Sequence, residues 1–238
     1  MRGHRSRKPI GFRQWVVHRR MTDKAQKAIE SLRQAKLKGS TYNTEEVNAA
    51  LEEAFHSKCY ICENNQATSY QIEHLHPHQG DMELKYDWEN LFLACAHCNN
   101  TKLGQYDPMI DCTKENVEES IAFRKKGYFG TDEELLFEAL NSRTETLNTQ
   151  SLLQDVYYGS TPQKKRESKI LRRFLRKELS EFKEYVREYQ EAEGEEKEDL
   201  RCELKKQLSD RSPFAAFKRW LIRDNKEAYP ELMAYIDK

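Results

Sequence analysis

Four cysteines constrain this chain more than any other feature, because they form two Cys-x-x-Cys pairs, Cys59 with Cys62 and Cys95 with Cys98. Two thiolates spaced in this way reach one metal ion from a single turn, at about 2.3 Å, and two pairs fill the tetrahedral shell of one Zn²⁺. Such an ion has no position left for water, so the spacing predicts a structural zinc ion that folds the middle of the chain.

The residues in and just after this cysteine frame have the chemistry for cleaving a phosphodiester. His74 is a candidate base, because a neutral imidazole near physiological pH can take a proton from water. Glu73 and Asn99 offer hard oxygen donors for Mg²⁺ or Mn²⁺. Lys102 is placed to meet phosphate, and the Asn90 amide is placed to tie a loop to the backbone. Together they predict a metal-assisted hydrolytic site.

Composition describes a polar, helix-rich protein rather than a membrane or disulfide-rich one. The 238 residues are 37% hydrophobic and 34% charged, and no apolar run approaches the roughly 20 residues of a membrane span. The basic N-terminus is followed by no apolar segment, so it does not resemble a secretory signal. Six cysteines in such a chain suit metal ligands and spare thiols, which predicts a cytoplasmic protein without a membrane partner.

Charge is segregated along the chain although the formal net charge is zero. Residues 1–20 carry basic side chains and no acid, and residues 164–177 form a second basic stretch interrupted only by Glu167. Acidic residues gather instead at 191–199. This segregation favours contact with phosphate along one face, and the alternative is an ordinary solvated helix surface.

The hydrophobic pattern predicts a mainly helical α+β protein. Helices are expected at 22–38, from Thr44, and over 94–104, with a strand between Thr68 and Leu75 and a second extended segment over Leu84–Tyr86. Further helices are expected from Thr131, over Pro162 to Ala192, after Gly194 and from Ser212. We expect three regions: a basic arm (1–21), a metal-organised core with leading helices (22–125) and a helical region (126–238).

The order Cys-x-x-Cys, Glu-His-x-x-Pro, Asn-Leu, Cys-x-x-Cys-Asn-x-x-Lys resembles the HNH endonucleases of the ββα-metal fold over residues 55–105. The resemblance implies a small ββα-metal core with a structural zinc ion. It implies that His74 is the general base, that Asn90 orders the loop, and that Asn99 and Glu73 hold the catalytic Mg²⁺ or Mn²⁺. Glu73 stands where most relatives have aspartate, so its longer side chain departs from the family pattern.

More narrowly, the motif segments and the helical C-terminal half resemble the PtuB-like HNH subunits of Septu-type anti-phage systems. These subunits also occur as retron effectors. This resemblance implies DNA as substrate, an ABC-type, PtuA-like ATPase subunit as partner, and a retron reverse transcriptase–RNA complex as a further partner. Two other hypotheses stay open: a zinc-organised nucleic-acid or protein adaptor without catalysis, and an RNA-cleaving HNH nuclease. His76, His78 and His97 have no role that the sequence assigns.

Overall fold

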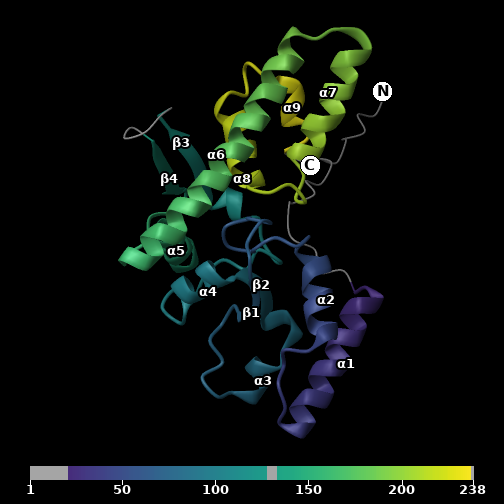
Figure 1. Cartoon of the computed structure of the whole chain (residues 1–238), viewed down its shortest axis with the longest axis vertical. Coiled ribbons are helices and arrows are strands. Elements are labelled where there is room, and N and C mark those ends of the chain that lie inside the picture. Colours follow the sequence, from purple (N-terminus) through teal and green to yellow (C-terminus); the bar gives the residue numbers. More distant parts are fainter. Residues whose placement is uncertain (1–20, 128–132, 237–238) are drawn as a thin grey trace, which may run out of the picture.

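The computed structural model describes residues 21–127 and 133–236 of the chain. Figure 1 shows α1, α2, β1, β2 and α4 at one end of the molecule and the α6–α9 helices at the other, with the β3–β4 hairpin beside α6. The basic arm expected at residues 1–21 lies outside the described residues, apart from Met21.

The first two helices form as the sequence predicts. Helix α1 spans Asp23–Lys38 and α2 spans Glu45–Ala54, and each has a threonine N-cap whose hydroxyl accepts a backbone N–H. Gly39 ends α1 in the left-handed conformation that glycine adopts without steric cost. Their apolar faces pack together and bury Leu32 and Leu51 almost completely.

A ββα unit follows the first cysteine pair and contains the second. Strand β1 (Tyr70–His74) pairs antiparallel with β2 (Leu91–Cys95), with Ile72 opposite Leu93, and α4 (Ala96–Lys102) follows β2 directly. Every residue of β2 is buried. The second extended segment expected at Leu84–Tyr86 is wrong: these residues belong to or follow the short helix α3 (Met82–Lys85), which Asp81 caps.

A second hairpin replaces the helix expected after Thr131. Strands β3 (Ile121–Lys126) and β4 (Glu134–Ala139) pair antiparallel. The helical prediction fails because burial alternates with a period of two along β4: Leu135 and Phe137 are buried, whereas Glu134 and Glu138 are exposed. The boundary expected at residue 125 falls within β3 of this hairpin.

The C-terminal half is helical, as expected. Helix α6 (Pro162–Glu191) confirms the predicted long helix, with Thr161 as its cap and Pro162 in its first turn. The other helices are α5 (Thr144–Tyr158), α7 (Gly194–Gln207), α8 (Ala215–Asp224) and α9 (Pro230–Met233). None of the helices in the described part of the chain is long and apolar enough to cross a membrane.

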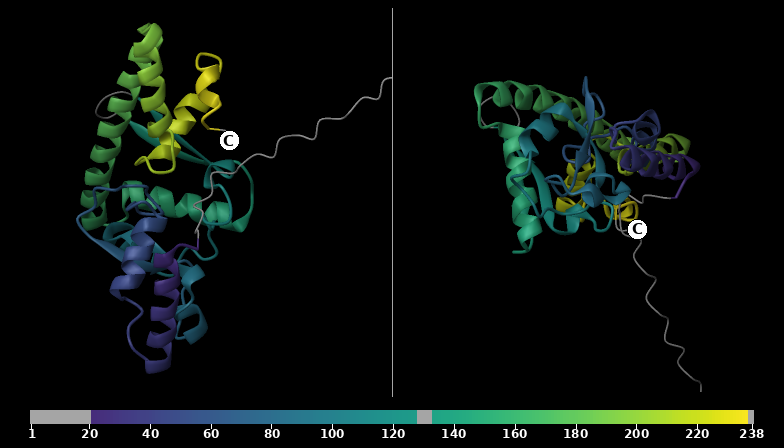
Figure 2. Two further views of the ribbon diagram at one scale, coloured as in Figure 1. Left: turned by 90° about the vertical axis from the view of Figure 1, so that its right-hand side faces the viewer. Right: turned by 90° about the horizontal axis from the view of Figure 1, so that it is seen from below.

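One buried cluster connects the two halves of the chain. It runs from Leu32 and Leu51 through Phe92 to Tyr157 and Phe217, so the ββα unit shares its core with α5 and α8. A second buried cluster lies among α6, α7, α8 and α9. The ribbons of these helices lie together at one end of the molecule in Figure 2. The shared core fixes the ββα unit relative to the C-terminal helices.

The turn between α5 and α6 requires glycine. Gly159 has φ +72°, and a Cβ there would lie 2.4 Å from Lys165 N and 2.5 Å from Lys164 C. We expect Gly159→Ala to lower the free energy of unfolding by about 2–3 kcal/mol, from backbone strain and this clash. The control Gly194→Ala meets no neighbour and should cost about 1 kcal/mol. Urea denaturation measures both, and equal losses would contradict the expected clash.

Candidate metal centre and active site

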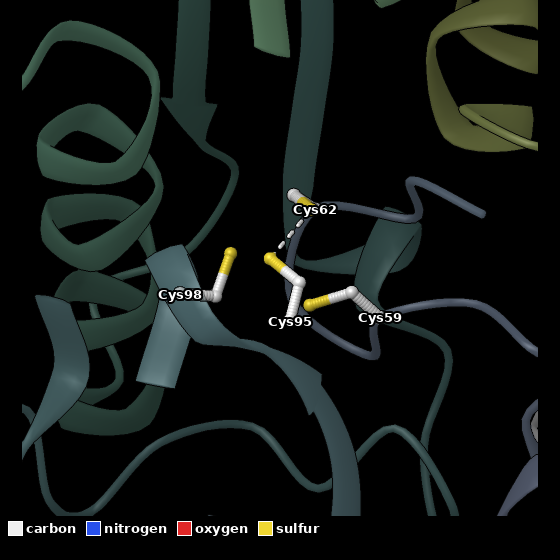
Figure 3. Close-up of side chains that lie close together, drawn as sticks. All are labelled: Cys59, Cys62, Cys95 and Cys98. Carbon is white, nitrogen blue, oxygen red and sulfur yellow. Dashed lines mark hydrogen bonds between the residues drawn. The ribbon is translucent and has the colours of Figure 1, made fainter. Parts of the chain in front are cut away.

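The four predicted zinc ligands come together in the structure. The Sγ atoms of Cys59, Cys62, Cys95 and Cys98 all lie within 4.8 Å of one another, and all four residues are buried (Figure 3). The separation of Cys62 Sγ from Cys95 Sγ is 3.9 Å. Four bonds of about 2.3 Å to a tetrahedral ion place neighbouring sulfur atoms roughly 3.8 Å apart, so small movements of the cysteine side chains would let the cluster bind Zn²⁺.

The chemistry of these thiols is compatible with a bound cation. Burial raises the pKa of Cys62 and of Cys98 well above its usual value, because a lone thiolate is poorly solvated there. A zinc ion reverses this preference, because it deprotonates a coordinating thiol outright. The four cysteines therefore form a metal site of the structural type, in which every ligand position is a sulfur.

The first cysteine pair is anchored to the C-terminal half. Tyr157 of α5 donates its hydroxyl to Cys62 O at 3.1 Å. Phe214 N donates to Glu63 O at 3.3 Å, and Ala216 N in the first turn of α8 donates to Glu63 Oε2 at 2.9 Å. The metal site therefore lies at the junction between the ββα unit and helices α5 and α8.

His74, at the end of β1, is held by a backbone carbonyl that fixes its tautomer. Its Nε2 lies 3.0 Å from Lys85 O, and a carbonyl oxygen only accepts, so Nε2 carries the proton and Nδ1 presents its lone pair. The rings of Tyr42 and His78 each pack edge-on against it, at 4.8 Å between centroids. Burial lowers the pKa of His74, which keeps the imidazole neutral.

Asn90 ties the segment after β1 to helix α3. Its Oδ1 accepts the His76 N–H at 2.8 Å, and its Nδ2 donates to His76 O at 2.9 Å and to Leu84 O at 3.0 Å. The buried amide thus uses both donors and its acceptor on backbone groups. Because Leu84 precedes Lys85, the same amide also fixes the carbonyl that orients His74.

Glu73 and Lys102 form a buried ion pair between β1 and α4. Lys102 Nζ lies 2.7 Å from Glu73 Oε1 and 2.8 Å from His74 O, and only 1% of the lysine side chain is exposed. Burial raises the pKa of Glu73, and the ammonium of Lys102 opposes that rise. Lys102 was expected to meet phosphate, but its burial gives it a different place, bracing the strand that carries His74.

Asn99 lies on the same side of α4, one turn before Lys102. Its Nδ2 donates to Gln71 Oε1, which leaves the amide oxygen for another partner. Lys102 bonds to Oε1 of Glu73, so the other carboxylate oxygen, Oε2, does not take part in that bond. The seam between β1 and α4 therefore offers one carboxylate oxygen and one amide oxygen, which are the hard donors that Mg²⁺ and Mn²⁺ prefer. An ion held there would share Glu73 with the Lys102 ammonium.

Residues 59–104 match the family model described as HNH endonuclease. This segment is an HNH domain. It begins at Cys59, contains both cysteine pairs and ends just after α4, so the match covers the complete ββα unit. A search of curated proteins and a search of solved structures found no match to the chain.

Several contacts of the HNH domain escaped sequence reasoning because their partners are distant in the chain. His76 Nδ1 lies 2.6 Å from Asp107 Oδ1. His97 of α4 joins Glu167 Oε2 of α6 at 2.8 Å and Val156 O of α5 at 2.7 Å, and thereby braces the metal-binding helix against both helices. The sequence left a bracing role open for His97 but could not identify its partners, since only the fold brings α4 against α5 and α6.

Proposed function

We propose that this chain is a metal-dependent endonuclease that hydrolyses DNA phosphodiester bonds. The match of residues 59–104 supports a nuclease of the HNH family. The observation that carries the proposal is the setting of His74: buried, neutral, and held through Nε2 on Lys85 O so that Nδ1 is the basic atom. A neutral imidazole with a fixed tautomer is suited to proton transfer, and an adaptor that only binds has no need of it together with Glu73 and Asn99.

In the proposed reaction, His74 Nδ1 accepts a proton from the attacking water. Asn90 keeps Lys85 O and the His76 segment in place, so the imidazole does not rotate. Glu73 and Asn99 would hold Mg²⁺ or Mn²⁺, which when bound polarises the phosphate and stabilises the leaving oxygen. Lys102 positions Glu73 and the end of β1 and makes no contact with substrate.

We favour DNA as the substrate. The basic half of α6 is the surface that would contact the phosphates of a nucleic acid. Its side chains at Lys165, Lys169 and Arg173 are exposed. The bond between His97 and Glu167 places this half of α6 against α4 of the HNH domain (Figure 1). A duplex whose backbone follows these cations would have its phosphates beside the HNH domain.

We further propose that the nuclease is the effector of an anti-phage defence complex and works with an ABC-type ATPase subunit. The resemblance of the motif segments to PtuB-like proteins supports this role. Helices α6–α9 form a second helical core beyond the HNH domain, which would offer the ATPase a rigid docking surface. Co-purification of the chain with the product of a neighbouring ATPase gene tests the partnership.

The test of the ion site compares Asn99→Ala with Asn100→Ala, an exposed neighbour on α4. If Asn99 binds the ion, its replacement should raise the Mn²⁺ concentration needed for plasmid cleavage about 10- to 100-fold, whereas Asn100→Ala should leave it unchanged. Crystals soaked in Mn²⁺ give a second readout, with anomalous density expected beside Glu73 and Asn99. Soaked crystals without density there would favour the zinc-organised adaptor.

A further inference from the structure

The ring of His74 has two other rings packed against it. Tyr42, from the loop between α1 and α2, and His78, from the turn before α3, each lie 4.8 Å from the His74 ring between centroids. We propose that His78 contacts the substrate, by donating its Nε2–H to a non-bridging oxygen of the scissile phosphate. This contact rests on the proposed function, because it concerns the phosphate that the same site would cleave.

One hydrogen bond fixes the tautomer of His78. Gly80 N lies 3.1 Å from His78 Nδ1, and a backbone N–H only donates, so Nδ1 accepts through its lone pair. In the neutral ring the proton is therefore on Nε2. No residue that the structure describes accepts a hydrogen bond from Nε2, and the side chain is only half-buried. The ring thus keeps one N–H donor for a bound substrate.

The turn that carries His78 holds this ring in place. Asp81 N donates to His78 O at 2.6 Å, which closes a tight turn, and the Asp81 side chain caps α3. Lys85, the last residue of α3, supplies the carbonyl that fixes the tautomer of His74. One short helix therefore positions both imidazoles. A donor that is held in place before the reaction costs no reorganisation when charge develops on the phosphate.

The distances around His74 bring a phosphate within reach of His78. A base contacts its water at about 2.6–3.2 Å, and the water attacks from about 3–3.5 Å, so the reacting phosphorus would lie roughly 6 Å from His74 Nδ1. The ring of His78 lies 4.8 Å from the ring of His74. The phosphate and the His78 ring would therefore be neighbours of the same imidazole, where one N–H···O contact can join them.

The burial of Lys102 leaves the phosphate without the donor that the sequence suggested. Negative charge grows on the non-bridging oxygens during hydrolysis, and a preformed donor beside that charge stabilises the transition state. The ammonium of Lys102 is bonded instead to Glu73 Oε1 and His74 O, at 2.7 and 2.8 Å. His78 brings an N–H donor to the ring of the base from a different segment of the chain.

Two substitutions separate the donor from the ring. His78→Phe keeps a ring against His74 and removes the N–H, whereas His78→Gln supplies an amide donor near the position of Nε2. At saturating Mn²⁺ we expect His78→Phe to lower kcat at least tenfold and His78→Gln to stay within about threefold of the wild type. The zinc content, the melting temperature and the Mn²⁺ requirement should not change. The control His56→Phe, outside the HNH domain, should leave kcat unchanged.

The outcomes separate this contact from the nuclease itself. If the wild type does not cleave, or if His74→Ala cleaves at the wild-type rate, the proposed function fails and the role of His78 fails with it. If His74→Ala loses activity while His78→Phe keeps the wild-type kcat, His78 does not contact the phosphate and the proposed function stands. Equal losses in His78→Phe and His78→Gln would assign His78 to the packing of the turn and overturn the substrate contact. Only a loss that His78→Gln restores supports it.

Discussion

Cys59→Ser should abolish zinc binding and unfold the HNH domain. The four sulfur atoms are buried and gathered within 4.8 Å, so three remaining thiolates would surround a site that has lost one of its ligands. Structural zinc in small domains contributes about 10–16 kcal/mol of apparent binding free energy. This binding free energy is as large as, or larger than, the free energy of unfolding of most domains, which is roughly 5–15 kcal/mol. No folded HNH domain should therefore persist.

Elemental analysis and circular dichroism measure this loss. The matched control is Cys202→Ser, because Cys202 is exposed on α7 and belongs to no cysteine cluster in the described structure. We expect about one zinc ion per chain in the wild type and the control, and none in Cys59→Ser. Since Cys62 O and Glu63 anchor α5 and α8, unfolding should extend to the C-terminal helices. A Cys59→Ser protein with unchanged melting temperature would contradict a structural zinc site.

Lys102→Met should lower the free energy of unfolding by about 3–5 kcal/mol, the usual cost of removing one partner of a buried ion pair. The lysine side chain is 1% exposed and that of Glu73 is 9% exposed, so water cannot replace the lost ammonium. His74 O would also lose a hydrogen bond, which loosens the end of β1.

The double variant Glu73→Gln/Lys102→Met separates the loss of charge pairing from the loss of packing. With no carboxylate left to desolvate, most of the stability should return, because neutral groups of similar shape often replace a buried ion pair at little cost. Chemical denaturation of the wild type, the single variants and the double variant gives the coupling energy directly. If the double variant were as unstable as Lys102→Met, the stability lost in Lys102→Met would not come from an unpaired Glu73 carboxylate.

Local signals in the sequence predicted much of the fold. The apolar periodicity of residues 22–38, the cap at Thr44 and the first-turn Pro162 are read from neighbouring residues, so α1, α2 and α6 begin and end near the expected positions. The cysteine spacing likewise predicted the sulfur cluster, because ligands to one ion must converge.

What the sequence could not predict depends on packing over long distances. The segment after Glu133 carries acids and leucines that suit a helix, and pairing with β3 makes it a strand. Lys102 resembled a phosphate contact until α4 packed against β1 and buried it on Glu73. The carbonyl that orients His74 belongs to Lys85, whose place depends on the three hydrogen bonds of Asn90.

The most direct test of the nuclease is plasmid cleavage by His74→Ala in Mg²⁺ or Mn²⁺, with zinc content and melting temperature measured on the same samples. Loss of a general base typically costs about 10²–10⁴ in rate, so we expect at least a hundredfold decrease with zinc and fold retained. The control His56→Ala, outside the HNH domain and paired with Asp210, should cleave like the wild type. A His74→Ala protein that cleaves at the wild-type rate would contradict the assignment of His74 as the base.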